Sequence, residues 1–265
     1  MQKSHSRFSR KQLGTFMTLV VAAIVAASPM PSAQGDRPVP FKVGETLTFD
    51  VSWTTFLSAG TATMAVKERR PGASGRSAYH LVAEGQPSSM LGKLYSLYYK
   101  AESILDTRTL LPSLATIYSD EGGRKRYKTT TFKGNGSVLY EVKTSTTATS
   151  TIKAPSTAQD PLGAIYILRA LPLKAGMTAS IPIPIIDSGK AYTMRVRVGG
   201  LENVKSGLGT LQALKLSMTI TGVDGKAEGT GFSLWLSDDA RKLPLKISAG
   251  LAVGSVHLTL AKVTG

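Results

Sequence analysis

The 265-residue sequence contains no cysteine. It therefore has no disulfide, no thiolate metal ligand and no cysteine nucleophile, and its stability must come from an ordinary packed core. Histidine is scarce, with three residues, and the 17 acidic residues are outnumbered by 32 Lys and Arg. The resulting formal net charge of +15 favours contact with anionic surfaces, such as phospholipid headgroups or the phosphates of lipopolysaccharide.

The N-terminus has the pattern of a secretion signal. Four basic residues and no acid precede the apolar, small-residue-rich stretch 13–27: Lys3, Arg7, Arg10 and Lys11. A stretch of roughly 15 apolar residues fits a signal peptide and is short for a membrane-spanning helix, which needs about 20. We expect residues 1–33 to be a Sec-type signal peptide and the mature protein to be periplasmic. An uncleaved N-terminal anchor is the alternative. Export makes nucleic acid an unexpected partner.

The remaining sequence is dominated by alternation of apolar and polar residues. Residues 34–40 are polar and contain proline, which is typical of a linker. Alternation then begins within residues 41–265, as in 47–53 and 214–220, and turn signals such as Gly134-Asn135-Gly136 separate the runs. Roughly a dozen strands with short connections predict a single antiparallel all-β domain, either a β-barrel or a strongly curved sheet.

One segment departs from the two-residue period. Asp160 followed by Pro161 is a helix start, because Asp is a good N-cap and Pro is tolerated in the first turn. Apolar residues then recur at helical spacing, at Leu162, Ile165 and Leu168. We expect one short helix near residues 161–170, lying across the sheet as a lid or plug.

Several landmarks occur together in a characteristic order. They are the segment 41–47 with Trp53 and Gly60, Asp160-Pro161-Leu162 with Tyr166 and Arg169, the segment 234–244, and Gly254-Ser255-Val256. Together they resemble a bacterial family of exported β proteins, domain of unknown function 3108, over nearly the whole mature chain. The resemblance implies a Gram-negative periplasmic β domain. It implies no activity and supplies no catalytic residue.

The sequence offers no convincing catalytic or metal-binding set. Ser150 and Lys153 match a Ser-x-x-Lys pattern, but their strand-like surroundings place them on opposite faces. His80 and His257 lie within predicted strands, where a structural role is the usual one. Adjacent acids lie at predicted turns, where Asp commonly bonds its own backbone: Asp120-Glu121 and Asp238-Asp239. We therefore expect no enzyme activity, no metal and no cofactor.

The basic segment 124–128 is the most functional-looking feature. Alternation places Arg124, Arg126 and Lys128 on one face, at intervals of about 7 Å. Three cations at that spacing form a candidate site for an anionic surface. The alternative is a solvated edge strand whose lysines discourage aggregation between sheets.

Two functions remain open from the sequence. The first is a non-enzymatic binding protein of the cell envelope, whose concave face holds a lipid or other hydrophobic ligand; its partners would be a lipid, lipopolysaccharide or an anionic membrane surface. The alternative is a structural or assembly factor of the envelope that acts through protein–protein contacts, with partners the sequence does not name.

Overall fold

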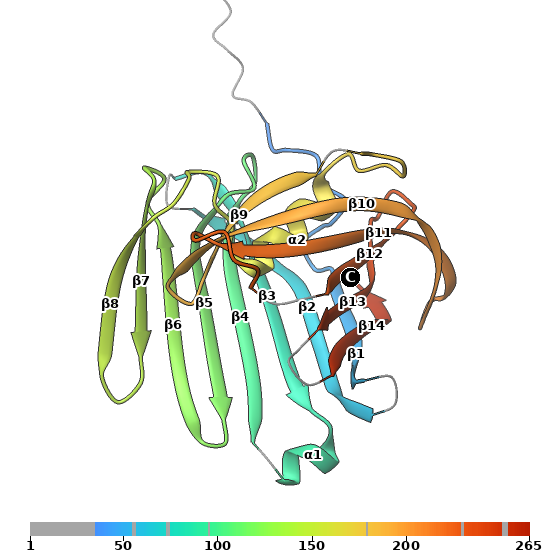
Figure 1. The fold of residues 1–265 in the computed structure, drawn as a ribbon, viewed down its shortest axis with the longest axis horizontal. Coiled ribbons are helices and arrows are strands. Elements are labelled where there is room, and N and C mark those ends of the chain that lie inside the picture. Colours follow the sequence, from blue (N-terminus) through green and yellow to red (C-terminus); the bar gives the residue numbers. More distant parts are fainter. Residues whose placement is uncertain are drawn as a thin grey trace, which may run out of the picture. The chain divides into compact units, whose positions relative to one another are not determined.

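The computed structural model describes residues 35–54, 57–72, 75–94, 96–178, 180–228, 231–250 and 254–265. Gly35–Gly265 form a compact unit, and the predicted signal peptide lies outside the described residues. Fourteen strands and two helices make up this described part (Figure 1). In chain order they are β1 (Thr46–Trp53), β2 (Leu57–Pro71), β3 (Ser77–Pro87), α1 (Ser89–Leu94), β4 (Leu97–Asp106), β5 (Pro112–Glu121), β6 (Arg124–Phe132), β7 (Ser137–Lys143), β8 (Thr147–Lys153), α2 (Pro161–Ala170), β9 (Ile181–Asp187), β10 (Lys190–Ser206), β11 (Gly209–Gly222), β12 (Phe232–Ser237), β13 (Pro244–Gly250) and β14 (Ser255–Thr264).

All the described strands belong to one antiparallel sheet, and the first strand, β1, lies inside this sheet and not at its edge. β1 pairs with β2 on one side and with β14 on the other. From this pair, one half of the sheet runs strand by strand to β8 and the other half runs to β9. β8 and β9 are the two edges and are not paired with each other, so the sheet is curved but open. The predicted antiparallel all-β fold is confirmed in its curved-sheet form.

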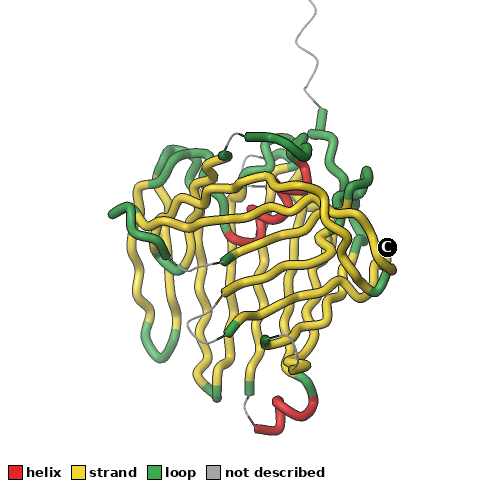
Figure 2. The backbone as a smooth tube through the Cα atoms, turned by 45° about the vertical axis from the view of Figure 1, so that its right-hand side comes forward, coloured by secondary structure: helices red, strands yellow, loops and turns green. Residues whose placement is uncertain are grey.

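The predicted helix forms over the expected residues and lies on the concave side of the sheet (Figures 1 and 2). Asp160 caps it by accepting hydrogen bonds from the backbone N–H groups of Leu162 and Gly163, both at 3.0 Å. Such a cap is worth about 0.5–2 kcal/mol. Gly163 is needed here, because a Cβ at this position would lie 2.8 Å from Oδ2 of Asp160.

The start of α2 is tied to both halves of the sheet. On one side, the Ser103 hydroxyl of β4 donates to Asp160 Oδ2 at 2.7 Å. On the other, Gln159 exchanges backbone hydrogen bonds with β9: its N–H donates to Pro184 O at 2.9 Å, and its carbonyl accepts from Ile186 N at 2.8 Å. These contacts fix the point at which the chain crosses from the β8 edge to the β9 edge.

α2 is apolar on more than one side because it packs on both halves of the sheet. Leu162 and Tyr166 are buried in the cluster that contains Leu47 and Phe49 of β1, whereas Ala164 and Leu168 join the cluster built from β9–β12. A helix that is apolar nearly all round is typical of a core position. The expectation of a helix packed across the sheet is therefore met within the described unit.

A buried ion pair anchors the C-terminal end of α2. Arg169 is 1% exposed, and its Nη1 and Nη2 bind the two carboxylate oxygens of Glu45 at 2.6 and 3.0 Å. The same guanidinium donates to the carbonyls of Lys242 and Arg241, at 3.1 and 3.2 Å. Three segments that served as sequence landmarks, 41–47, 160–169 and 234–244, thus meet at one side chain. The three landmarks therefore share a structural contact.

Two further segments complete the fold. In the expected linker, the Asp36 carboxylate pairs with Arg69 at 2.6 Å, and Arg37 N–H donates to Thr107 O at 3.0 Å. Part of this segment is therefore bonded to the domain and is not a free spacer. α1 lies between β3 and β4, in addition to the one helix that the sequence analysis expected. Neither helix in the described residues has the length and apolar character needed to cross a membrane.

Candidate ligand-binding cavity

The described structure has an apolar cavity of about 500 Å³ between α2 and the concave face of β9–β13. One face of the helix forms one wall, and side chains from five strands form the other. The lining residues are Pro161, Ala164, Ile165, Leu168, Ile185, Asp187, Tyr192, Met194, Met218, Ile220, Glu228, Phe232, Leu234, Ile247 and Ala249. Leu168 and Leu234 are buried, whereas Met218 and Phe232 are half-buried. The cavity is therefore apolar in its depth and reaches solvent.

Polar groups gather at one end of the cavity. Tyr192 of β10 lies opposite Gly222 of β11, and a Cβ at Gly222 would lie 3.6 Å from Oε1 of Glu228. Asp187, at the end of β9, completes the group and accepts a hydrogen bond from Ser188 Oγ at 3.3 Å. Burial raises the pKa of Tyr192, and the nearby charges of Asp187 and then Glu228 raise it further. One phenol and two carboxylates therefore define a polar end.

Apolar side chains continue beyond the opposite end. Ala249 in the cavity wall pairs with Val256 of β14, which pairs in turn with Trp53 of β1. Residues directly opposite one another in an antiparallel pair share a face of the sheet, so all three lie on the concave side. Trp53 is 40% exposed. The cavity and its surroundings thus run from a polar end to an exposed aromatic ring.

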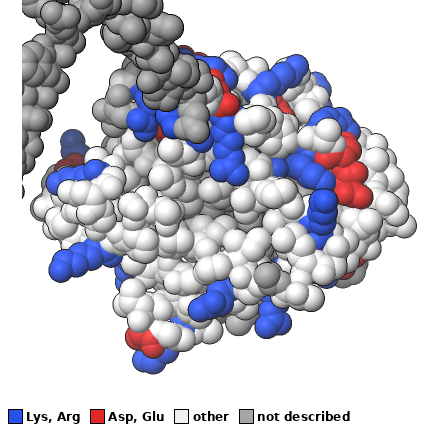
Figure 3. Space-filling model, turned by 90° about the horizontal axis from the view of Figure 1, so that it is seen from above, with Lys and Arg blue, Asp and Glu red and all other residues white. Residues whose placement is uncertain are grey.

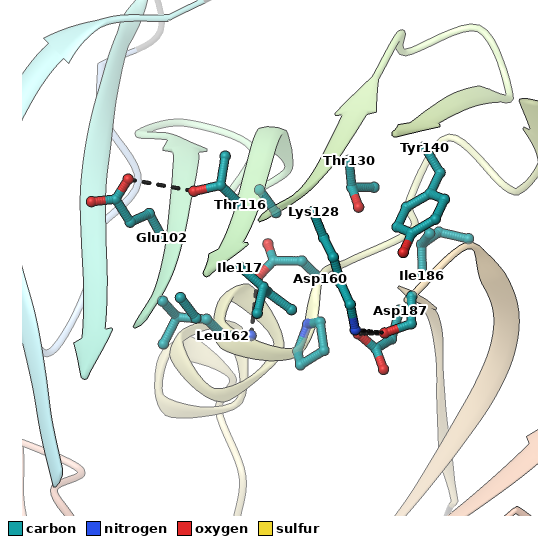
Figure 4. A pocket seen from close by; sticks show the side chains of 14 residues that line it. Glu102, Thr116, Ile117, Lys128, Thr130, Tyr140, Asp160, Leu162, Ile186 and Asp187 are labelled. Carbon is teal, nitrogen blue, oxygen red and sulfur yellow. Dashed lines mark hydrogen bonds between the residues drawn. The ribbon is translucent and has the colours of Figure 1, made fainter. Parts of the chain in front are cut away.

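A second, much smaller cavity of about 40 Å³ lies between α2 and β4–β7 (Figure 4). Lys128 of β6 reaches across it and donates to Ser188 Oγ at 2.9 Å. A Cβ at Gly189 would lie 2.8 Å from the Tyr140 ring of β7, so only glycine allows this close approach. The β9–β10 turn is thereby seated on β6 and β7. Asp187 and Pro161 line both cavities and form the wall between them.

Asp160 lines the small cavity but is used by the fold. Burial raises the pKa of this carboxyl, and the hydrogen bonds from Ser103 and from the N–H groups of Gly163 and Leu162 oppose that rise. All these partners belong to the helix start described above. Asp160 is therefore engaged in capping and positioning α2.

The predicted basic residues lie on the concave face of β6. Lys128 pairs with Ile117, which pairs with Ala101, and all three line the small cavity; alternation then places Arg126 and Arg124 on the same side. Arg126 pairs with Glu121 at 3.3 Å, and Arg124 is exposed. The shared face follows the sequence prediction, but its direction, toward the helix and the β9–β10 turn, was not predicted. Binding of an anionic surface stays a prediction.

Positive charge is not confined to this strand. Figure 3 shows Lys and Arg side chains spread over the face seen from above, with fewer acidic side chains among them. Their wide spacing indicates a diffuse positive field, in keeping with the net charge of +15.

The residues that the sequence analysis rejected as catalytic or metal-binding candidates have structural roles. His80 lies between Glu68 and Glu102, and His257 contacts Ser255 Oγ at 2.9 Å. Ser150 and Lys153 lie on the edge strand β8. The acid pairs hold turns: Asp120 accepts from Gly123 N, and Asp239 accepts from Arg241 N, both at 3.0 Å. No group of three His, Asp or Glu within the described residues is arranged to hold a metal ion.

The sequence analysis suggested a hydrophobic ligand on the concave face, but it identified none of the residues at the polar end of the cavity. Asp187, Tyr192 and Glu228 come from the end of one strand, from the next strand and from a loop beyond β11, and they share no motif. The local signal that was available was the turn composition of Asp187-Ser188-Gly189, which indicates a hairpin and says nothing of what the hairpin faces.

The open curved sheet with a helix inside it defines a β-barrel-like class of protein. The chain belongs to the family described as "Protein of unknown function (DUF3108)", whose model matches residues 48–261. The resemblance stated from the sequence landmarks is confirmed. No curated protein matches the chain.

One solved structure supports the fold class. A β-barrel-like protein of the domain of unknown function DUF1849 from Brucella abortus is 11% identical, with a TM-score of 0.51, over 83% of this chain and 96% of that one. At this identity the likeness shows the fold alone. A protein provisionally described as a lipoprotein, from Parabacteroides distasonis, is 10% identical with a TM-score of 0.35, over 87% of this chain and 100% of that one. A provisionally described exported protein with a YmcC-like fold, from Bacteroides fragilis, gives the same four values.

Proposed function

We propose that this protein is an exported, non-enzymatic binding protein of the cell envelope that holds the apolar part of a lipid or other amphiphile in the cavity between α2 and β9–β13. The observation that carries the proposal is the cavity itself. Its volume of about 500 Å³ falls within the roughly 300–1,000 Å³ typical of small-molecule sites. As in such sites, the lining is mostly apolar and the few polar groups are grouped.

The contrast with the neighbouring packing supports the proposal. Protein interiors are close-packed, and deleting buried side chains to leave a cavity costs stability. Around α2, Leu162 and Tyr166 fill the space toward β1–β4, whereas Ala164 and Ile165 leave the space toward β10–β13 open. An apolar ligand in that space would gain the burial that the protein's own side chains do not provide.

Export is part of the same proposal. It rests on the basic and apolar residues at the N-terminus, which fit a Sec-type signal peptide, and a periplasmic location places the protein beside lipid surfaces. We expect periplasmic material to begin between Ser28 and Gly35. N-terminal sequencing tests this, and an intact Met1 in the membrane fraction would identify residues 13–27 as an anchor instead.

Filling the cavity tests the binding function. Ala249→Trp would place a large side chain in the cavity, while Ser248→Trp, on the next residue of β13, would point the same side chain to the opposite face. We expect native mass spectrometry of protein purified from the periplasm to show a retained ligand with the wild type and with Ser248→Trp, and none with Ala249→Trp. An apolar fluorescent probe should follow the same order.

Two results would count against this function. One is absence of both a retained ligand and probe binding in the folded wild-type protein. The other is equal binding by the two tryptophan variants, which would place the ligand outside the cavity. Circular dichroism spectra and melting curves establish that both variants are folded.

One observation favours the alternative of an envelope assembly factor. β8 is an edge strand of seven residues, nearly all of them exposed, and one of its sides has no strand partner in the described sheet. Such an edge accepts an added strand from another protein. Crosslinking of the mature protein in envelope extracts, through a photoreactive residue at Thr149, should capture a protein partner. A strict monomer with no crosslinked product would refute this role.

A further inference from the structure

We propose that the cavity is selective for amphiphiles whose headgroup carries an ammonium group, with Asp187 and Glu228 as its receptors. This inference rests on the proposed binding function and adds the chemical class of the headgroup. It reverses the expectation from the net charge of +15, of which four positive charges lie in the predicted signal peptide, because a protein that stays this basic should attract anionic amphiphiles more strongly than cationic ones.

The two carboxylates at the polar end are the only charged side chains in the described lining of the large cavity. Neither Asp187 nor Glu228 forms an ion pair with any residue that the structure describes, although nearby Asp224 pairs with Lys226 at 3.4 Å. Two lysines lie near Asp187 outside this lining: Lys128 donates to Ser188 Oγ at 2.9 Å from the side of the small cavity, and Lys190 lies opposite Asp187 in the β9–β10 hairpin. The described wall of the large cavity therefore carries two carboxylates and no Lys, Arg or His side chain.

The surroundings give the charge of Asp187 more effect than that of a surface carboxylate. Both line a cavity whose other walls are mostly Leu, Ile, Met and Phe, but Asp187 is half-buried and Glu228 is exposed, so the lower local dielectric strengthens the charge interactions of Asp187 in particular. Burial raises the pKa of Tyr192, and the charges of Asp187 and then of Glu228 raise it further, in keeping with the position of all three residues in the lining of one cavity.

A bound amphiphile has one favourable orientation in this cavity. Its chain would lie along Leu234, Ile247 and Ala249, where no charged side chain lines the wall, and its headgroup would lie beside Tyr192. An ammonium group there gains two opposite charges. A carboxylate or phosphate would instead bring a third negative charge to the site, which is unfavourable. A neutral hydroxyl would be intermediate.

Three ligands with the same twelve-carbon chain test the inference: dodecylamine, dodecanol and dodecanoate. Their affinities are measured at pH 7 and low salt, below their micelle concentrations, by displacement of the apolar fluorescent probe. We expect dodecylamine to bind roughly tenfold tighter than dodecanoate, with dodecanol between them, since each partly exposed charge pair contributes modestly and the two ligands differ in sign.

The variant Asp187→Asn/Glu228→Gln removes both charges and keeps the side-chain shapes. We expect it to reduce the ratio between amine and carboxylate to about twofold or less, and to leave dodecanol binding unchanged. The matched control, Asp50→Asn/Glu141→Gln, makes the same change in net charge at β1 and β7, away from the cavity, and should keep the wild-type ratio. Melting curves of all three proteins verify that they are folded.

The outcomes separate this inference from the binding function. If dodecanoate binds as tightly as dodecylamine, or if the cavity variant keeps the wild-type ratio, the headgroup assignment is wrong while the cavity remains a binding site. An equal loss of selectivity in both double variants would assign the preference to the diffuse field of the protein and would also overturn the inference. If none of the three ligands displaces the probe, the proposed function itself fails.

Discussion

Breaking the buried ion pair between Glu45 and Arg169 should destabilise the protein strongly. Glu45→Met leaves the guanidinium of Arg169, which is 1% exposed, without its carboxylate and with two of its four hydrogen bonds removed. Removing one partner of a buried pair typically costs about 3–5 kcal/mol. That is a large part of the roughly 5–15 kcal/mol by which domains are stable.

Urea unfolding of the mature protein measures this effect, with the free energy of unfolding taken by linear extrapolation. A double-mutant cycle with Arg169→Met separates the pair from its surroundings. Because two apolar side chains replace two opposite charges, Glu45→Met/Arg169→Met should lose less stability than the two single variants added together. Asp224→Asn is the matched control, since it breaks a pair whose side chains are 81% and 52% exposed, and it should cost at most about 1 kcal/mol.

A small effect would refute the reasoning. If Glu45→Met costs no more than the Asp224→Asn control, the guanidinium of Arg169 reaches water or another acceptor, and the pair does not anchor α2. Additive single effects in the cycle would likewise show that Glu45 and Arg169 act independently.

Three further predictions concern the strand register, the basic strand and acid stability. Leu216→Ala should lower the free energy of unfolding by about 2–5 kcal/mol because Leu216 is fully buried, whereas Ser217→Ala, on the opposite face, should change it by no more than about 0.5 kcal/mol. Equal effects of the two substitutions in urea unfolding would contradict the register of β11. The variant Arg124→Ser/Arg126→Ser/Lys128→Ser should weaken cosedimentation with anionic vesicles at low salt. The control makes the same change at three exposed cations elsewhere, Arg195, Arg197 and Lys205, and should weaken it less. Equal losses would show that binding depends only on the diffuse positive field. Burial would raise the pKa of the Asp106 carboxyl, but hydrogen bonds from Thr109, Arg76 and Arg108 outweigh burial and lower the pKa. Ionised Asp106 therefore stabilises the fold fully above its unfolded pKa of about 3.9, and this contribution is lost as the pH falls through the lower folded pKa. Asp106→Asn should therefore flatten the acid end of a curve of unfolding free energy against pH, and an unchanged curve would show that Asp106 contributes nothing there.

The strands and α2 were predictable because their signals are local. Apolar residues at every second position mark the concave face, and Leu216 and Leu234 are buried as that period requires. Asp160 and Pro161 specify the helix start within two adjacent residues, through the geometry of one hydrogen-bonded turn. Neither feature depends on which strand lies beside which.

The cavity was not predictable because it depends on pairing between distant segments. The contact between Glu45 and Arg169 joins residues 124 positions apart, and the polar end of the cavity needs β9, β10 and a loop after β11 to converge. Alternation likewise showed that Arg124 and Lys128 share a face, but only the position of Ser188 against β6 reveals that this face is concave. Long-range strand pairing determines where the cavity lies and which way the face of β6 points, and a single sequence contains little direct information about such pairing.

The pairing of β1 with β14 has a consequence for the order in which the protein can fold. β1 and β14 join the two halves of the sheet through contacts such as Thr46 opposite Thr264, among the most distant in the sequence. Closing so long a loop is slow compared with forming neighbouring hairpins. As the chain emerges N-terminus first, the β1–β8 meander can form early, but one flank of β1 stays unpaired until β14 has crossed. The two halves would then be joined by a single late step, and until it occurs the exposed flank of β1 is open to chaperones and to incorrect strand partners.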